Sequence, residues 1–215
     1  MFRLAIAVLL SLSSAWGFTA QAGEAAPSIR RWQPLIKRVL QQKPEFSERA
    51  LENAFTYLVS HSNRVSNKNY ITVVDFELPS VAERMLVINL RTGAFRSFLV
   101  AHGEKSGFEY ASQFSNAENS LMSSLGAYLT GKEYVGSNGL SMILKGQEAS
   151  NSNAERRKIV MHGADYVSEA YIEEHGVLDT SWGCPAIEHK YETDLVNKLK
   201  NGSVFYIYHP DLERK

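Results

Sequence analysis

The chain contains a single cysteine, Cys184, in 215 residues. A disulfide within the chain is therefore excluded. In an exported protein, which lives where disulfides form, a lone thiol is a liability unless its chemistry is used. Composition alone leaves two interpretations open: a reactive thiol, or a buried cysteine that packs as a small hydrophobe.

An excess of charge is also lacking, since 23 Lys and Arg face 23 Asp and Glu. This balance, with no basic run, argues against a nucleic-acid partner. Long apolar runs are missing as well, because no segment after residue 22 could span a bilayer. After removal of a leader, association with a membrane would require a partner protein.

The first 22 residues have the pattern of a secretory signal peptide. Arg3 supplies the positive end, Leu4–Leu12 is almost wholly apolar, and Ala20-Gln21-Ala22 fits the cleavage pattern. The apolar run is shorter than the ~20 residues of a spanning helix, although a retained N-terminal anchor is the alternative. We expect export to the periplasm, with cleavage after Ala22.

The remaining sequence predicts a helical segment over residues 23–66 and one mainly β domain of the α+β class over residues 67–215. Apolar residues at helical spacing indicate two N-terminal helices and one near the C-terminus, whereas β-rich runs indicate strands between them. The predicted helices are 30–42, one from Ser47, and 191–199; the predicted strands are 71–76, 84–90, 94–101, 140–144, 158–161 and 204–208. The polar stretch 103–124 is predicted to be a long loop beside a substrate cleft, with Ser115, Asn116 and Ser124 as candidate contacts.

A histidine and the cysteine stand in contexts suited to nucleophilic catalysis. His162 ends an apolar run and is followed by Gly163, and Cys184 comes 22 residues after it in a Ser-x-Gly-Cys turn. A strand end can hold an imidazole rigidly, and Gly183 permits a tight turn whose N–H groups can face an oxyanion. His162 could serve as base or cationic neighbour for the thiol.

Blander interpretations remain possible for the same residues. His162 could be a core histidine, and His102 has the same strand-end context before a glycine. The two histidines and Cys184 could also bind zinc, but the sequence lacks a close pair of ligands such as Cys-x-x-Cys.

Residues 70–209 resemble the murein L,D-transpeptidase catalytic domain family. The resemblance is carried by Met161-His162-Gly163, by Ser181-Trp182-Gly183-Cys184-Pro185, and by the run from Phe114-Ser115-Asn116 to Ser123-Ser124-Leu125-Gly126-Ala127-Tyr128. It implies a mixed sheet bent into a sandwich-like or barrel-like body. It also implies an enzyme that acts on the peptide stems of peptidoglycan and needs no metal or organic cofactor.

Carried over residue by residue, the resemblance makes Cys184 the nucleophile and His162 its base, with the carbonyl of Gly163 orienting the imidazole. Ser181 and Gly183 match the family's turn, which would help to form the oxyanion hole. Two positions depart from the common pattern: Trp182 stands where histidine is usual, and Ala186 stands where Arg or Asn is usual. Trp182 and His102 are further candidates for substrate contact. A stem-trimming hydrolase of the same fold and a non-catalytic wall-binding module are the alternatives.

Overall fold

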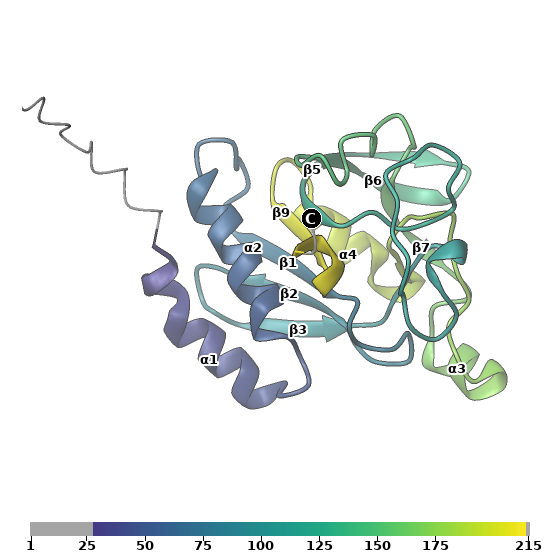
Figure 1. Ribbon diagram of the computed structural model, residues 1–215, viewed down its shortest axis with the longest axis horizontal. Coiled ribbons are helices and arrows are strands. Elements are labelled where there is room, and N and C mark those ends of the chain that lie inside the picture. Colours follow the sequence, from purple (N-terminus) through teal and green to yellow (C-terminus); the bar gives the residue numbers. More distant parts are fainter. Residues whose placement is uncertain (1–27, 214–215) are drawn as a thin grey trace, which may run out of the picture.

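A nine-stranded mixed sheet forms the body of the protein in a computed structural model, which describes residues 28–213. The predicted signal peptide and its cleavage site lie outside the described residues. The sheet curls into a near-barrel (Figure 1). Its strand order is β3-β2-β1-β9-β5-β6-β7-β8-β4. The bounds are β1 Tyr70–Asp75, β2 Met85–Asn89, β3 Phe95–Phe98, β4 Val100–Ala101, β5 Gly126–Gly136, β6 Gly139–Gly146, β7 Val160–Ala164, β8 Ala186–Glu188 and β9 Val204–Tyr208.

Two strand pairs are parallel, β1 with β9 and β7 with β8, and the other neighbours are antiparallel. A parallel pair needs a crossover connection, often a helix. The connection from β7 to β8 carries α3 (Glu169–His175) and then the turn that contains Cys184. The sheet topology therefore brings the chain back beside β7 just after the cysteine.

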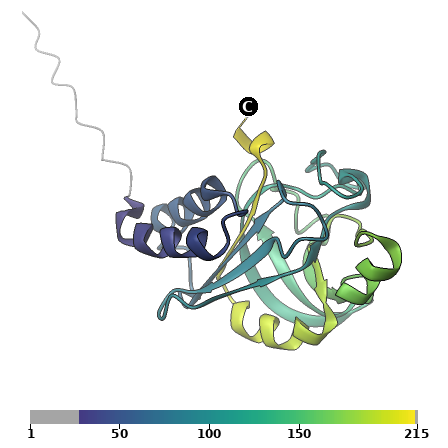
Figure 2. The same ribbon diagram turned by 90° about the horizontal axis from the view of Figure 1, so that it is seen from below.

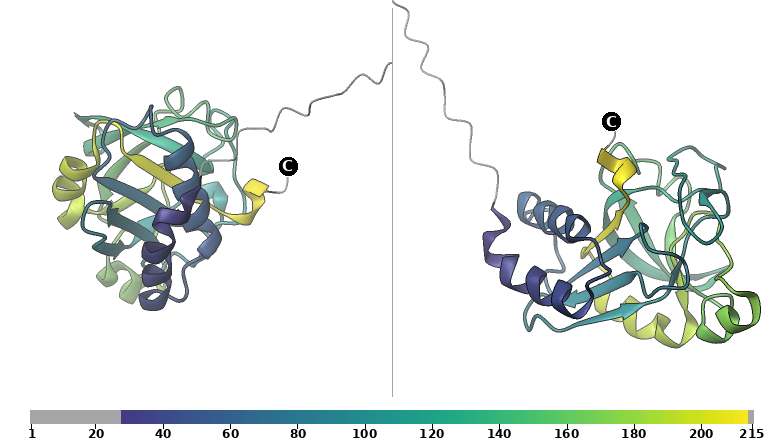
Figure 3. Two further views of the ribbon diagram at one scale, coloured as in Figure 1. Left: turned by 90° about the vertical axis from the view of Figure 1, so that its left-hand side faces the viewer. Right: turned by 60° about the horizontal axis from the view of Figure 1, so that its bottom comes forward.

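Helices cover the sheet from different sides, as Figures 2 and 3 show. The N-terminal pair, α1 (Gln33–Gln42) and α2 (Glu48–Ser60), packs together, and α2 lies on β1 and β9. The helix α4 (His189–Leu199) lies against β6, β7 and β8. Short 3-10 turns occur at Ile29–Trp32, Glu104–Ser106 and Pro210–Glu213. Within residues 28–213, no helix combines the length and apolar character needed to cross a membrane.

The apolar stripe of α2 is buried in a core that lies between the N-terminal helices and the sheet. Burying a large apolar side chain contributes about 1.5–3 kcal/mol, so this helix is held by packing. Ser47 occupies the N-cap position, but its side chain makes no capping bond. Its N–H donates instead to Asp75 Oδ2 at 2.8 Å, which ties the start of α2 to β1. The buried residues of the stripe are Ala50, Leu51, Ala54, Phe55 and Leu58.

The predicted fold class is confirmed, as are the strands at 71–76, 140–144 and 204–208 and the helices near both ends. Besides the 3-10 turns, three elements were not predicted: β5, β8 and α3. Strand β8 is only three residues long. Strand β5 contains Gly131 and a bulge between Thr130 and Glu133, which break its apolar pattern. Helix α3 is only seven residues long and has no buried residue, so it has no apolar stripe to detect.

Candidate active site

The parallel pairing of β7 with β8 brings His162, the middle residue of β7, near Cys184, which lies two residues before β8 begins. His162 is in register with Ala186, two residues after the cysteine. Continued backwards by two residues, this register places Cys184 opposite Val160, and the Val160 N–H indeed donates to Cys184 Sγ at 3.5 Å. The two side chains therefore start about 7 Å apart along the strand direction, two residue rises.

The imidazole of His162 is fixed in one tautomer by its neighbour. Nδ1 lies 2.8 Å from the carbonyl oxygen of Gly163. A carbonyl only accepts, so Nδ1 carries the hydrogen and donates, and Nε2 keeps its lone pair. His162 is 6% exposed, and burial lowers its pKa, against the opposing effects of the Gly163 carbonyl and Glu192. The ring is thus a neutral base near neutral pH.

Gly163 is needed because α4 approaches the strand closely at this point. Its N–H donates to Glu192 Oε1 at 2.5 Å. A Cβ added to Gly163 would lie 2.3 Å from Nδ1 of His189 and 2.7 Å from Glu192 Oε1. Glu192 therefore braces the strand beside His162, a role that the sequence pattern did not indicate.

Cys184 is a partly exposed thiol held against backbone polar groups of the β7 segment. Besides the Val160 N–H, its Sγ lies 3.8 Å from the carbonyl oxygen of Lys158. Burial raises the pKa of the thiol, while the Val160 N–H and the charge of Arg157 act in the opposite direction. Among the hydrogen bonds of residues 28–213, none joins Sγ to His162. The resting thiol is therefore protonated and reacts only when a base removes its proton.

The turn before the cysteine is organised by Ser181, which is 5% exposed. Its hydroxyl donates to the carbonyl of Cys184 at 2.6 Å and accepts from the Gly183 N–H at 3.0 Å. Gly183 has a φ of +117°, a conformation that side-chain-bearing residues rarely adopt. The Gly183 N–H is thus already occupied. The N–H groups of Trp182 and Cys184 donate to no acceptor in the described part of the chain.

His102 is a buried residue that braces the cysteine turn, and its predicted contact with substrate stays a prediction. It is 1% exposed, accepts a hydrogen bond from Arg84 Nη2 on Nδ1 at 2.7 Å and donates from Nε2 to the Gly107 carbonyl at 3.1 Å. Burial and Arg84 lower its pKa to about 4. The backbone carbonyl of His102 accepts from the Ser181 N–H at 2.9 Å. The buried Arg84–His102 pair therefore supports the turn that precedes Cys184.

Arg157 is the cationic side chain whose charge lowers the pKa of Cys184. It also holds the loop predicted over residues 103–124. Its guanidinium donates to the Ser115 carbonyl at 2.8 Å, to Ser124 Oγ at 3.1 Å and to Ser120 Oγ at 3.3 Å, and it also bonds the Met122 carbonyl. This role could not be predicted from the sequence, because two consecutive arginines, Arg156 and Arg157, are typical of a solvated surface.

The three loop residues predicted to contact substrate are tied to the protein itself. Ser115 Oγ accepts from the Ala117 N–H, Asn116 bonds Ala149, Ser152 and Asn153, and Ser124 Oγ bonds Tyr128 Oη at 2.7 Å. Ser124 is 1% exposed and has no free face for a ligand. Ser115 and Asn116 border a cavity of about 430 Å³, so a contact there stays a prediction.

Two aromatic residues flank the thiol. Trp182 is 78% exposed directly before Gly183, whereas Tyr166 is half-buried in the loop after β7. Burial, the Cys184 side chain and Asp179 raise the pKa of Tyr166 to about 12. Trp182 is thus free to meet a substrate, and Tyr166 is a neighbour of the thiol that the sequence analysis did not identify.

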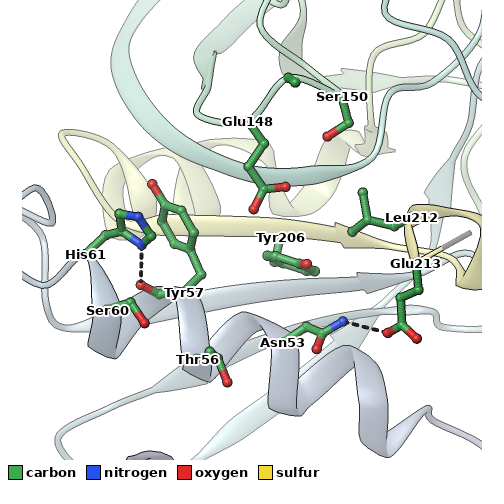
Figure 4. A pocket seen from close by; sticks show the side chains of 11 residues that line it. Asn53, Thr56, Tyr57, Ser60, His61, Glu148, Ser150, Tyr206, Leu212 and Glu213 are labelled. Atoms are coloured by element: carbon green, nitrogen blue, oxygen red, sulfur yellow. Dashed lines mark hydrogen bonds between the residues drawn. The ribbon is translucent and has the colours of Figure 1, made fainter. Parts of the chain in front are cut away.

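A second polar hollow of about 430 Å³ lies between α2, β9 and the C-terminal turn, away from the cysteine. Figure 4 shows hydroxyl, carboxylate and imidazole groups around it, including Tyr57, His61 and Glu148. It adjoins the cavity beside Asn116, because Ser150 and Leu212 line both. It contains no thiol, and within residues 28–213 no three His, Cys, Asp or Glu side chains gather as a metal site.

The sequence matches the family of L,D-transpeptidase catalytic domains over residues 42–208. The match begins at the last residue of α1 and includes α2. No curated protein matches the sequence. The resemblance inferred from the His162 and Cys184 segments is confirmed by the family match, whereas the domain boundary at residues 66 and 67 stays a prediction.

Solved structures with a similar fold share little sequence with this chain. The LD transpeptidase LdtMt1, solved in complex with imipenem, has 12% identity and a TM-score of 0.41, over 65% of this chain and 59% of that one. The helical cell shape determining protein Pgp2 from Campylobacter jejuni has 13% identity and a TM-score of 0.39, over 66% and 49%. The chain thus spans less than two thirds of the length of either.

Replacing Gly183 by alanine should test how tightly the turn is constrained. The added Cβ would lie 2.6 Å from the Met122 carbonyl oxygen at a φ of +117°. Backbone strain and clash should together cost about 1–3 kcal/mol in the free energy of unfolding, measured by urea denaturation.

Gly176→Ala is the matched control, because Gly176 has a φ of +83° but nothing within 4 Å of an added Cβ. It should show only the cost of positive φ. Equal losses in the two variants would mean that the Met122 carbonyl does not constrain the turn.

Proposed function

Because the chain belongs to the L,D-transpeptidase catalytic domain family, we propose that it is a cysteine acyl transferase that acts on the peptide stems of peptidoglycan. The observation that supports this best is the His162 imidazole, whose Nδ1–H is held by the Gly163 carbonyl at 2.8 Å and whose Nε2 is left as a base. By the register of β7 with β8, it is offset by two residues along the strand direction from Cys184, the only cysteine of the chain.

In the proposed first step, Cys184 Sγ attacks the carbonyl carbon between the L-centre of the stem's diamino acid and the terminal D-alanine. His162 Nε2 takes the thiol proton, since both groups are neutral at rest. The carbon–nitrogen bond then breaks, and His162 returns the proton to the departing amine of D-alanine. The stem remains on Cys184 as a thioester.

In the second step an acceptor amine attacks the thioester carbonyl and gives its proton to His162. The carbon–sulfur bond then breaks, His162 returns the proton to the Cys184 thiolate, and the stem is left joined to the acceptor as a crosslink. We assign the oxyanion of both steps to the N–H groups of Cys184 and Trp182. The Gly183 N–H is left out of this assignment because Ser181 Oγ already accepts from it. Preorganised N–H donors at a developing oxyanion typically contribute a few kcal/mol to catalysis.

Two alternatives use the same residues differently. If water replaces the acceptor amine, the enzyme is an L,D-carboxypeptidase or a hydrolase that trims stems or releases wall-bound proteins. If Cys184 is inert, the chain is a wall-binding module. The partial exposure of Cys184 and the lone pair on His162 Nε2 favour an enzyme over a wall-binding module.

We place this activity outside the cytoplasm, in the periplasm, because peptidoglycan stems lie there and residues 1–22 have a leader pattern. The substrate of the proposed enzyme and its predicted export are thus consistent with each other.

Incubation of the protein with purified tetrapeptide muropeptides should yield crosslinked dimers. Mass spectrometry distinguishes them from tripeptides, which a carboxypeptidase would release. Cys184→Ser should abolish either product, because a serine hydroxyl is far harder to ionise beside the same histidine. A carbapenem, whose strained β-lactam is an electrophile for the same thiol, should add once to the wild type and not to the serine variant.

Wild-type protein that folds but gives neither product nor adduct would overturn the enzyme proposal. Retention of product by Cys184→Ser would remove the cysteine from the mechanism.

The pH dependence of kcat/KM should follow the protonation of His162. Only its unprotonated form accepts the thiol proton, and its pKa is lowered from the ordinary 6.5. The rate kcat/KM should therefore stay high through pH 6.5 and fall only in more acid solution. His162→Ala should lose that acid limb together with about 10²–10⁴-fold in rate, whereas His175→Ala, an exposed histidine on α3, should leave both unchanged. An acid limb that persists in His162→Ala belongs to another group.

A further inference from the structure

Arg157 is a partly buried cation that no carboxylate neutralises within residues 28–213. Both terminal nitrogens of its guanidinium bond to one loop, to the carbonyls of Ser115 and Met122 and to the hydroxyls of Ser120 and Ser124. A cation removed from water without a counter-charge is costly. Burial lowers the pKa of Arg157, and the groups that act against this are Tyr128 and Cys184.

The same guanidinium lies against the turn that presents the cysteine. A Cβ added to Gly183 would be 2.9 Å from Arg157 Nη2 and 2.6 Å from the Met122 carbonyl oxygen. The carbonyl that Arg157 binds is thus the one that rests on the turn. Arg157 therefore connects the loop of residues 115–124, the Gly183 backbone and the environment of the thiol.

We propose that Arg157 is the positioning residue for Cys184: its guanidinium clamps the loop of residues 115–124 over the Gly183 turn and supplies the positive charge that the thiolate faces. This role rests on the proposed function of Cys184 as nucleophile. Because its terminal nitrogens are occupied by the loop, Arg157 acts on the thiol through its charge and does not bind the stem. The other titratable groups near the thiol are Tyr128, Tyr166 and His162.

The test is the rate at which iodoacetamide alkylates the folded protein between pH 6 and pH 10, without any peptidoglycan. Cys184 is the only thiol, so the rate reports on it alone. Arg157→Gln should react about tenfold more slowly than the wild type at pH 7, with the profile displaced upward by ~1 pH unit. Arg157→Lys keeps the charge and should shift the profile much less.

Arg156→Gln is the matched control, because this neighbouring arginine is exposed and its partner on the same loop is Glu118. Its profile should match that of the wild type. Hydrogen exchange in residues 115–124 gives a second readout: it should rise in both Arg157 variants, since lysine cannot reproduce the four bonds of the fork.

An Arg157→Gln profile equal to those of the wild type and Arg156→Gln would overturn the electrostatic role. Faster alkylation in both Arg157 variants would assign the residue to loop closure alone. The alkylation profile of Arg157→Gln could be displaced although the wild type turns over no muropeptide. That result would support the role of Arg157 beside the thiolate and refute the proposed function.

Discussion

The pairing of β7 with β8 in a parallel register is the constraint on which the candidate site depends. It sets His162 beside Ala186 and thereby places Cys184 next to Val160 at the end of the same strands. A slip of one residue would turn His162 to the opposite face of the sheet. Helix α4 secures the register from one side through Glu192, and the buried Arg84–His102 pair supports the cysteine turn from the other.

Electrostatics at this site favour a neutral resting pair over an ion pair. Burial lowers the pKa of His162 and raises that of Cys184, so each shift disfavours the charged form. In the proposed mechanism the thiol proton passes to His162 as Cys184 attacks the stem carbonyl, and a thiol that rests protonated is less prone to oxidation than a thiolate. The charge of Arg157 offsets part of the free-energy cost of forming the buried thiolate, without a permanent ion pair between the two groups.

The sequence predicted the central residues because their signals are local. An apolar run before His162, a glycine after it and a Ser-x-Gly-Cys turn are all visible in short windows, and the structure pairs them through β7 and β8. Arg157, Tyr166 and Glu192 could not be found in this way, since their roles depend on contacts between distant segments. The bracing role of His102 was missed for the same reason, because its burial against Arg84 follows from the tertiary fold. Strand β5 was missed because glycines and a bulge interrupt its pattern.

The most direct test of Cys184 as nucleophile is to mix the protein with a tetrapeptide stem and quench the reaction rapidly. Proteolysis at acid pH and peptide mapping then follow. The peptide that contains Cys184 should carry a thioester, seen as a mass increase equal to the mass of the stem minus that of D-alanine. This adduct should decay when an acceptor amine is added. Product formation with no acylated Cys184 at any quench time, or a stem attached to another residue, would contradict it.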